Sequence, residues 1–389
     1  MLEKAQSLKE RLIHLRRTIH KHPELGFEEL QTGALVAETL ADLGIEFQSG
    51  IGKTGLVARL GNGNGPTIGV RADMDALPIL EANEVEYKSQ VPGKMHACGH
   101  DAHTAILMGA AMLLKDEPFD GEIRLLFQPS EEQKDNENKS GATRMIEDGA
   151  IDGLDAVIAL HVDGKVDRGK VSIGEGYTLA NSDRVVAKIF GAGGHGAMPH
   201  LSRDPLFLVA PVLTAIHGIV SRWVDPIQPA VVTIGRLAGG TAANVIPGEV
   251  EMDFSVRSIT DEVRQQLLAE IEQALSIART LGGDYSMEVL YGYPALYNDP
   301  SVTGWLKDTS ARLIGVDNVE NRPLSMGGED FAFMVQESRG AMMFLGAKAP
   351  DGPPKQFHHP EFDIDEEALP IGAAVLAATA LRFVRGEVS

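Results

Sequence analysis

Cysteine is almost absent from this chain of 389 residues: Cys98 is the only one, so no disulfide bond can form within the chain. A chain without disulfides suits a reducing compartment, and we expect a cytoplasmic location. Long apolar runs are lacking as well. The N-terminal segment has no apolar signal core, and no segment approaches the roughly 20 apolar residues of a membrane span, so no membrane partner is expected.

Basic residues are scarce too. The chain has 35 Lys and Arg against 55 Asp and Glu, and its formal net charge is −20. Without a basic run to follow phosphates, nucleic acid is not expected as a partner. The hydrophobic share of 43% and the charged share of 23% are ordinary for a globular protein. The length favours two domains over a single core.

Apolar runs alternate with helical patterns in the first and last parts of the chain, as in TIGVRADMD, TAILMGAAMLLK and EIRLLFQ. Continuous apolar strands between amphipathic segments are typical of an α/β fold, in which helices cover both faces of a mostly parallel sheet. We assign residues 1–181 and 293–389 to one discontinuous domain of this kind.

Between residues 182 and 292 the pattern changes. The predicted elements follow one another as strand, helix, strand, strand, helix and strand, which is the β-α-β-β-α-β order of a ferredoxin-like unit. Because the first pattern resumes afterwards, we predict that residues 182–292 form an inserted domain.

Side chains that bind metals gather around Cys98 and after the predicted strands. Cys98 lies in GKMHACGHDAHTA with three histidines within five positions. Ligands of open α/β sheets bind beyond the carboxyl ends of the strands, so these groups are expected to share one cleft. Sulfur, nitrogen and oxygen donors together suit borderline-soft divalent ions such as zinc, and the set suffices for two ions. The candidates at strand ends are Asp73, Asp75, Glu131, Glu132, His161, His358 and His359.

Each of these residues alone is more often structural than functional, since a histidine at a strand end or a Glu-Glu pair is usually solvated. Together they indicate a metal centre, because five separate elements would otherwise deliver such residues to one edge by chance. The pair Glu131–Glu132 also allows a division of roles. One carboxylate can bind metal while the other stays free as a base.

Eight motifs then carry a resemblance to a known family. The chain resembles the amidohydrolase branch of the aminoacylase-type metallopeptidases, which includes hippurate hydrolases, auxin-conjugate amidohydrolases and bacterial N-acyl-amino-acid deacylases. The similarity runs nearly from end to end. The motifs, in the order and spacing of that family, are MHACGHDAHT, QPSEE, ALHV, GGHGAMPH, NVIP, SVRS, GGEDFA and HHPEFDIDEEAL.

The resemblance implies two divalent metal ions, which could be zinc, manganese, cobalt or nickel, and it implies roles for matching residues. Glu131 would be the general base and acid, and Asp75 would support the metal cluster from behind the ligands. Other branches carry a histidine ligand where this chain has Asp73, which stays unassigned. The implied ligands are Cys98, His100, Glu132, His161 and His358.

Three residues of the inserted domain also match the family. His195 resembles the residue that stabilises the oxyanion, while Asn244 and Arg257 resemble those that hold the substrate carboxylate or the scissile carbonyl. Relatives often dimerise through this domain, which acts as a lid, so a homodimer or homotetramer is expected. His195 could then serve its own site or that of the neighbouring subunit.

The implied reaction is hydrolysis of the amide bond of N-acyl amino acids, such as hippurate or N-acetyl amino acids. A metallo-carboxypeptidase or dipeptidase that cleaves short peptides is the alternative, because both substrates present the same amide and carboxylate. The substrate partner is therefore a small N-acyl amino acid or a short peptide.

Three further readings of the sequence are weaker. GAGGHG at residues 191–196 satisfies a dinucleotide-binding pattern, but AMPHLSRD intervenes before the next helix. A thiol hydrolase based on Cys98 would leave the glutamates without a role. A binding protein that keeps a metal without turnover would not need Glu131 or His195.

Overall fold

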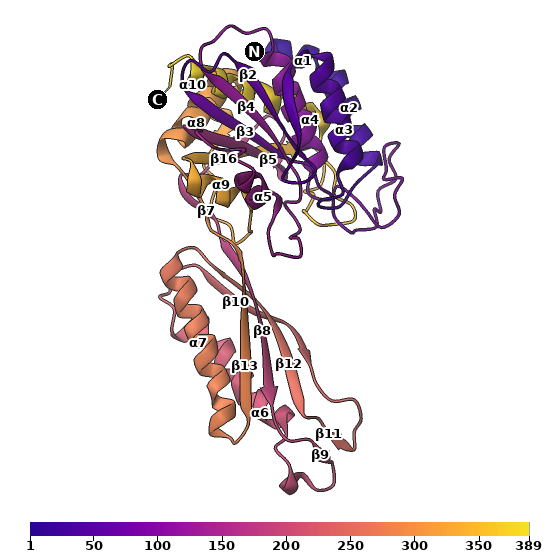
Figure 1. Ribbon diagram of the computed structural model, residues 1–389, viewed down its shortest axis with the longest axis vertical. Coiled ribbons are helices and arrows are strands. Elements are labelled where there is room, and N and C mark those ends of the chain that lie inside the picture. Colours follow the sequence, from indigo (N-terminus) through magenta and orange to yellow (C-terminus); the bar gives the residue numbers. More distant parts are fainter. Residues whose placement is uncertain (389) are drawn as a thin grey trace. The chain divides into compact units, whose positions relative to one another are not determined.

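The computed structural model describes residues 1–388 and divides the chain into two compact units, whose elements are labelled in Figure 1. Unit 1 comprises Met1–Gly176, Tyr297–Pro323 and the chain from Asp330 onward. Unit 2 comprises Tyr177–Leu296 and Leu324–Glu329. The short strands β7 (Gly176–Leu179) and β14 (Leu296–Asn298) contain two of the points at which the chain passes from one unit to the other, and the segment Leu324–Glu329 gives the other two.

Within residues 1–388, unit 1 is built on an eight-stranded sheet. In spatial order its strands are β1 (Glu46–Ile51), β2 (Gly55–Gly61), β4 (Glu122–Gln128), β3 (Thr67–Asp73), β5 (Ala156–Asp167), β16 (Gly340–Lys348), β6 (Val171–Ser172) and β15 (Val319–Glu320). The central strands β4, β3, β5 and β16 run parallel. On one side β2 and β1 continue the sheet antiparallel, and on the other β6 is antiparallel to β16 but parallel to β15. The predicted α/β fold with a mostly parallel sheet is therefore confirmed.

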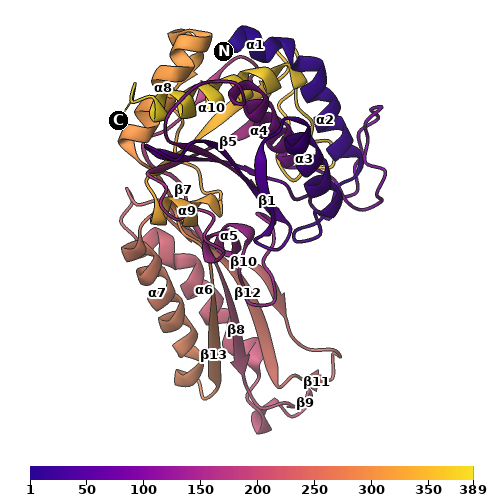
Figure 2. The same cartoon turned by 45° about the horizontal axis from the view of Figure 1, so that its top comes forward.

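Helices cover both faces of this sheet (Figures 1 and 2). One face carries α1 (Leu2–Ser7), α2 (Lys9–Lys21), α3 (Leu30–Asp42), α4 (His100–Leu114), α8 (Pro300–Ile314) and α10 (Leu369–Val384). The shorter α5 (Gly141–Glu147) and α9 (Phe331–Glu337) lie on the other. Alternate strand residues point to the first face and form one large apolar core with α4 and α10. Burial on both faces explains the continuous apolar runs of the sequence.

Two helices are long and apolar enough to cross a membrane by length and composition, although no such segment was expected from the sequence. The segment Glu366–Val384 has 83% of its window buried and forms part of the core of unit 1. The other, α6 (Pro205–Arg222), has 33% buried and packs one side against the sheet of unit 2. Core helices of globular proteins pass the same test, so the two helices are weak evidence for a membrane.

Unit 2 has the element order β8 (Asn181–Phe190), α6, β10 (Ala230–Ala238), β12 (Glu249–Ser258), α7 (Asp261–Thr280) and β13 (Asp284–Tyr293). Four of its strands pair antiparallel in the order β10-β12-β8-β13, and α6 and α7 pack on one face of this sheet. Local signals fix the helix starts. Asp204 and Thr260 cap α6 and α7 through their side chains, and Pro205 opens α6.

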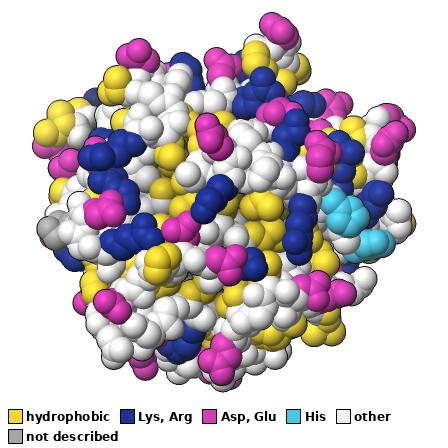
Figure 3. Space-filling model, turned by 90° about the horizontal axis from the view of Figure 1, so that it is seen from above, with side chains coloured by type: hydrophobic (Ala, Val, Ile, Leu, Met, Phe, Trp, Pro, Cys, Tyr) yellow, Lys and Arg dark blue, Asp and Glu magenta, His cyan; other side chains and the backbone are white. Residues whose placement is uncertain are grey.

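On the face shown in Figure 3, acidic and basic side chains are interspersed. Interspersing positive and negative side chains keeps like charges apart on a chain whose net charge is −20.

Candidate metal centre

Three segments that carry predicted donors have a residue with a positive φ, in the left-handed region, at or next to the donor. Gly99, between Cys98 and His100, has a φ of 94°, and a Cβ there would lie 2.3 Å from a methyl group of Val162. Ser130 has a φ of 44° directly before Glu131 and Glu132, and the φ of His358 is 59°. Non-glycine residues in this region are strained and cluster at functional sites.

The predicted donors of unit 1 converge in overlapping groups of three, in each of which the potential ligand atoms lie within 4.8 Å of one another. Sγ of Cys98 lies 3.5 Å from Nε2 of His161, and Nε2 of His358 lies 2.9 Å from Oε1 of Glu132. The groups are Cys98–His100–His161, His100–Glu131–Glu132 and Cys98–Glu132–His358. They share members, as a pair of neighbouring ions requires.

Two of the imidazoles are oriented to offer Nε2 to an ion. Nδ1 of His100 lies 3.1 Å from Oδ1 of Asp75, and its Nε2 has no hydrogen-bond partner among residues 1–388, although the side chain is buried. Nδ1 of His161 lies 2.7 Å from the carbonyl oxygen of Val162, to which it donates. Metal-binding histidines almost always donate their other ring N–H in this way. The donor set therefore fits a metal centre.

Asp73 and His103 lie beside these donors but have other partners. Nδ1 of His103 lies 2.6 Å from Oδ1 of Asp73, and its Nε2 accepts the backbone N–H of Val162 at 2.9 Å. Oδ2 of Asp73 accepts from the Arg71 guanidinium at 2.6 Å. Both nitrogens of His103 are thus in use. The structure gives Asp73, left unassigned from the sequence, the role of a counter-charge for Arg71 and an acceptor for His103.

Burial and carboxylates control protonation in this cluster. Burial, reinforced by Glu132 and Glu131, holds the pKa of the Cys98 thiol well above its usual range. Burial alone would lower the pKa of His100, but Asp73 and Asp75 outweigh it and raise the pKa to about 10. Without a bound cation Cys98 is therefore a neutral thiol, which counts against its use as a nucleophile.

The other two histidines of the cluster differ from His100. Burial, together with the neighbouring His103, holds the pKa of His161 well below its usual range. His161 is therefore neutral, as a metal ligand must be. The half-exposed His358 contacts Glu132, and this contact raises the pKa of His358.

A buried ionic network that the reading of the sequence missed lies beneath Glu131. Arg71 is 1% exposed and donates to Asp73, to Gln128 at 2.8 Å and to Asp330 at 2.9 Å. The backbone N–H of Asp330 points to Oε1 of Glu131 at 3.4 Å. The lone arginine in the apolar strand VRAD could have indicated this network, because burying a charge without a partner is unfavourable.

His96, the remaining histidine of the CGHDAH region, does not join the donors. It is buried, neither ring nitrogen has a partner within residues 1–388, and burial lowers its pKa to about 4. The neighbouring Asp101 pairs instead with Arg16 and His20, at 2.7 Å each.

The structure separates the predicted residues of unit 2. His195 lies on β9 (Gly194–His195), which pairs with β11 (Val245–Ile246), and Gly196 donates its backbone N–H to the carbonyl of Asn244 at 2.9 Å. Arg257 lies on β12 of the four-stranded sheet, opposite Ser182 near the start of β8, whereas β9 follows the end of β8. Arg257 donates to the carbonyl of Met326 at 2.8 Å. The nine residues from Ser182 to Phe190, at the end of β8, span roughly 26 Å.

The glycine pattern at residues 191–196 does not open a helix. It runs from the end of β8 into β9, and a 3₁₀ turn (Pro199–Leu201) follows before α6 begins at Pro205. A dinucleotide fingerprint needs the strand, the glycines and the helix in direct succession.

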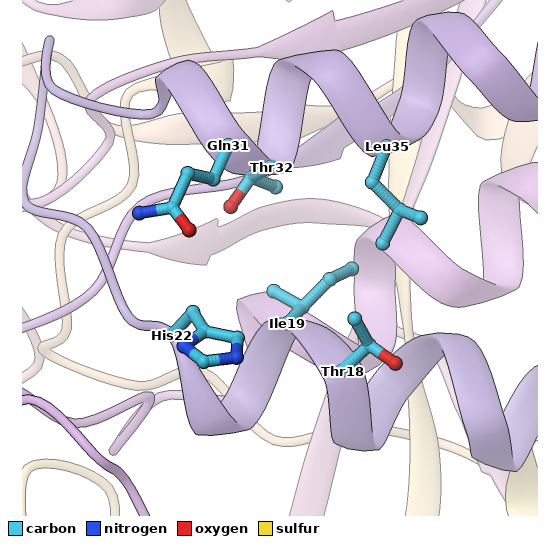
Figure 4. Close-up of a pocket in the computed structure, with 6 residues that line it drawn as sticks. All are labelled: Thr18, Ile19, His22, Gln31, Thr32 and Leu35. Atoms are coloured by element: carbon cyan, nitrogen blue, oxygen red, sulfur yellow. The ribbon is translucent and has the colours of Figure 1, made fainter.

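A separate pocket of about 150 Å³ lies between the end of α2 and the start of α3, and Figure 4 shows the side chains that line it. The backbone N–H groups of Gln31 and Thr32 donate to the carboxylate of Glu24 at 3.0 and 2.9 Å, so this helix start is already capped. None of the six lining residues is a predicted site residue; they are Thr18, Ile19, His22, Gln31, Thr32 and Leu35.

An α/β unit with a largely buried cluster of sulfur, nitrogen and oxygen donors in overlapping groups is typical of a metal-dependent hydrolase of the dinuclear type. The chain belongs to peptidase family M20/M25/M40, whose profile matches residues 69–382.

Relatives of the chain include hydrolases of two kinds. It is 39% identical to the IAA-amino acid hydrolase ILR1-like 4 of Arabidopsis thaliana over 96% of this chain and 86% of that protein. It is 38% identical to thermostable carboxypeptidase 2 of Saccharolobus solfataricus, over 96% and 95%. The crystal structure of Bacillus subtilis YxeP, a dinuclear metal-binding peptidase of the M20 family, superposes with a TM-score of 0.84 at 32% identity, covering 97% of this chain and 99% of that one.

These similarities confirm three expectations: the chain is an enzyme of the metal-dependent amidohydrolase or carboxypeptidase type, it resembles the amidohydrolase branch, and its cofactor is a pair of divalent metal ions.

Proposed function

We propose that this enzyme hydrolyses the amide bond of N-acyl amino acids to a carboxylate and a free amino acid. The observation that carries the proposal is the convergence of five donors in overlapping groups, one of which also contains the carboxylate of Glu131. The donors are Cys98, His100, Glu132, His161 and His358. The similarity to an IAA-amino acid hydrolase along almost the whole chain supports this substrate class.

In this proposal the five converging donors hold two divalent ions, with zinc, manganese, cobalt or nickel as the candidates. Cys98 is shared between the donor group of His100 and His161 and that of Glu132 and His358. Asp75 holds His100 from behind. When bound, the ions lower the pKa of a coordinated water and polarise the carbonyl of the amide.

Glu131 is the proposed general base and acid. Its side chain is 6% exposed and lies beside the donors, while the backbone N–H of Asp330 limits its freedom. Glu131 takes a proton from the attacking water and delivers it to the leaving amine. A positioned group of this kind typically contributes about 100- to 10,000-fold in rate.

Unit 2 supplies the proposed substrate contacts. His195 donates a hydrogen bond to the oxyanion, and removing such a donor typically costs about 100- to 1000-fold in kcat. The planar guanidinium of Arg257 suits the two oxygens of a carboxylate, and Asn244 orients the substrate. Arg257 lies opposite Ser182 near the start of β8, whereas His195 lies on β9, beyond the end of β8, so the two cannot contact one small substrate from the same chain.

This separation supports a homodimer or homotetramer in which His195 reaches the site of the partner subunit. We place the inserted domain, residues 182–292 in the sequence, in the role of lid and dimerisation surface. We also propose a cytoplasmic location, as the single buried cysteine suggests.

A metallo-carboxypeptidase or dipeptidase is the second candidate, because thermostable carboxypeptidase 2 is as similar to the chain as the amidohydrolases are. A peptide offers the same amide and carboxylate to the same residues, so the difference lies in what surrounds the acyl group.

The deciding experiment measures amine release from matched substrates, namely hippurate and N-acetyl amino acids against dipeptides and tripeptides of the same C-terminal residue. The demetallated protein is reloaded separately with zinc, manganese, cobalt and nickel. We expect the higher kcat/KM on N-acyl amino acids. A preference for peptides under every metal would favour the carboxypeptidase, and turnover indifferent to demetallation would contradict both candidates.

A further inference from the structure

Glu29 is a buried carboxyl for which the proposed function has no role. It is 0% exposed and precedes α3. Its Oε1 accepts the backbone N–H of Ser130 at 2.8 Å, and its Oε2 accepts the hydroxyl of Thr54 at 2.5 Å. Burial of a carboxyl is unfavourable unless its oxygens are hydrogen-bonded. Two hydrogen bonds therefore hold Glu29 in place, and one of them joins it to Ser130, the residue next to Glu131.

Ser130 is the strained point of the loop that follows β4. Its φ of 44° lies in the left-handed region, which residues with a Cβ adopt only under constraint. This turn directs Glu131 and Glu132 toward the donor cluster instead of continuing the strand. The hydroxyl of Ser130 donates to the carbonyl of Gln133 at 3.0 Å, and its own carbonyl accepts from Gly141 at 2.8 Å.

The segment around Glu29 also packs against Ser130 through its backbone. A Cβ on Gly26 would lie 2.2 Å from Oγ and 2.9 Å from Cβ of Ser130, so glycine is needed for this approach. The same segment contacts the loop that follows β3, because Leu25 bridges Ala76 and the N–H of Ala76 donates to the carbonyl of Glu24 at 2.8 Å. Residues 24–29 thus brace two of the loops that carry predicted site residues.

We propose that Glu29 is a positioning residue that holds Ser130 in its left-handed conformation and so aims the carboxylate of Glu131. The inference rests on the proposed function, in which Glu131 is the base. Glu29 touches neither substrate nor donor and acts only through the Ser130 N–H. A displacement of about 1 Å at a catalytic group can cost about 100-fold in rate, so the loss of this contact is expected to appear in kcat.

The test compares Glu29→Ala and Glu29→Gln, with Thr54→Val as the matched control that removes the other contact of Glu29. Glu29→Gln keeps an oxygen that accepts from Ser130 and should retain kcat within about 3-fold, whereas Glu29→Ala should lose about 10- to 100-fold in kcat at unchanged KM and metal content. Thr54→Val should keep a kcat close to that of the wild type, because Glu29 still accepts the Ser130 N–H. Equal losses in Glu29→Ala and Glu29→Gln would overturn the proposal, as would normal kcat in metal-loaded Glu29→Ala.

A second pair of variants tests the same turn if Glu29→Ala does not fold. Gly26→Ala places a Cβ against Oγ and Cβ of Ser130 and should lower kcat in the same way, while the added change Ser130→Gly removes both of these atoms and should restore it. No recovery in that double variant would overturn the proposal. Glu131→Gln is assayed in parallel: activity in that variant would contradict the proposed function, whereas normal Glu29→Ala beside inactive Glu131→Gln would contradict this inference alone.

Discussion

The carboxylate of Asp75 joins two predicted ligands that come from different parts of the chain. Its Oδ1 lies 3.1 Å from Nδ1 of His100, and its Oδ2 accepts the backbone N–H of Glu132 at 3.0 Å. Asp75 is 1% exposed and offers each oxygen to one neighbour. Its negative charge thereby orients one imidazole and fixes the loop that carries one carboxylate.

Asp75→Asn should weaken metal binding about 10- to 100-fold, because partners behind a ligand typically matter to that extent. The amide oxygen still accepts from Glu132, but His100 loses its anionic acceptor. Competition with a chromogenic chelator measures the change. Asp163→Asn is the control, since that buried carboxylate pairs with Arg322 and with no donor of the cluster. Equal affinities of the two variants would contradict this role for Asp75.

Metal affinity should rise with pH, because His100 and Cys98 hold protons in the metal-free protein. The pKa of His100 is raised to about 10 by Asp73 and Asp75 against the effect of burial, and burial with Glu132 raises that of Cys98. An ion must displace both protons below these pKa values, so affinity should increase up to about 100-fold per pH unit between pH 6 and 8. Calorimetry in buffers of different ionisation enthalpy counts the protons, and a count of zero would contradict the ligand assignment.

Cys98→Ser and His103→Gln separate a ligand from a neighbour that is not one. Cys98→Ser should lose metal on dialysis, whereas His103→Gln should keep two ions per chain and unfold at a lower temperature, because it breaks the contacts with Asp73 and Val162. Elemental analysis and thermal unfolding provide the readouts. Metal loss in His103→Gln together with full retention in Cys98→Ser would reverse the assignment.

The sequence predicted which side chains converge but not what holds them in place. The convergence of Cys98, Glu132 and His161 could be predicted because parallel strands end at one edge of a sheet, although β5 continues past His161 to Asp167. The contacts of Asp73 with Arg71 and His103 could not be predicted, because they depend on the directions of side chains that strand β3 and helix α4 bring together. Glu29 was equally hidden, since its contact with Ser130 joins residues 101 positions apart.

Glu131→Gln should keep both ions and lose about 100- to 10,000-fold in kcat, because the amide has the shape of the carboxylate but accepts no proton. Elemental analysis beside a turnover assay distinguishes this result from metal loss. The amide can still accept the N–H of Asp330, so the loop should be undisturbed. A variant with near-normal turnover would remove Glu131 from the role of base.

Mixed dimers test whether His195 serves the neighbouring site. Glu131→Gln and His195→Ala are each inactive in this proposal, and co-expression yields dimers that contain one copy of each. If His195 reaches across, one site of every mixed dimer combines an intact Glu131 with an intact His195, so activity should recover to about a quarter of wild type in a statistical mixture of two-fold dimers. If His195 serves its own chain, both sites of a mixed dimer lack one residue and activity stays absent. Differently tagged chains, purified in tandem, establish that the mixed dimer is present. Its inactivity would then contradict the reach of His195 across the subunits, and would require another explanation for the roughly 26 Å that separates the two ends of β8.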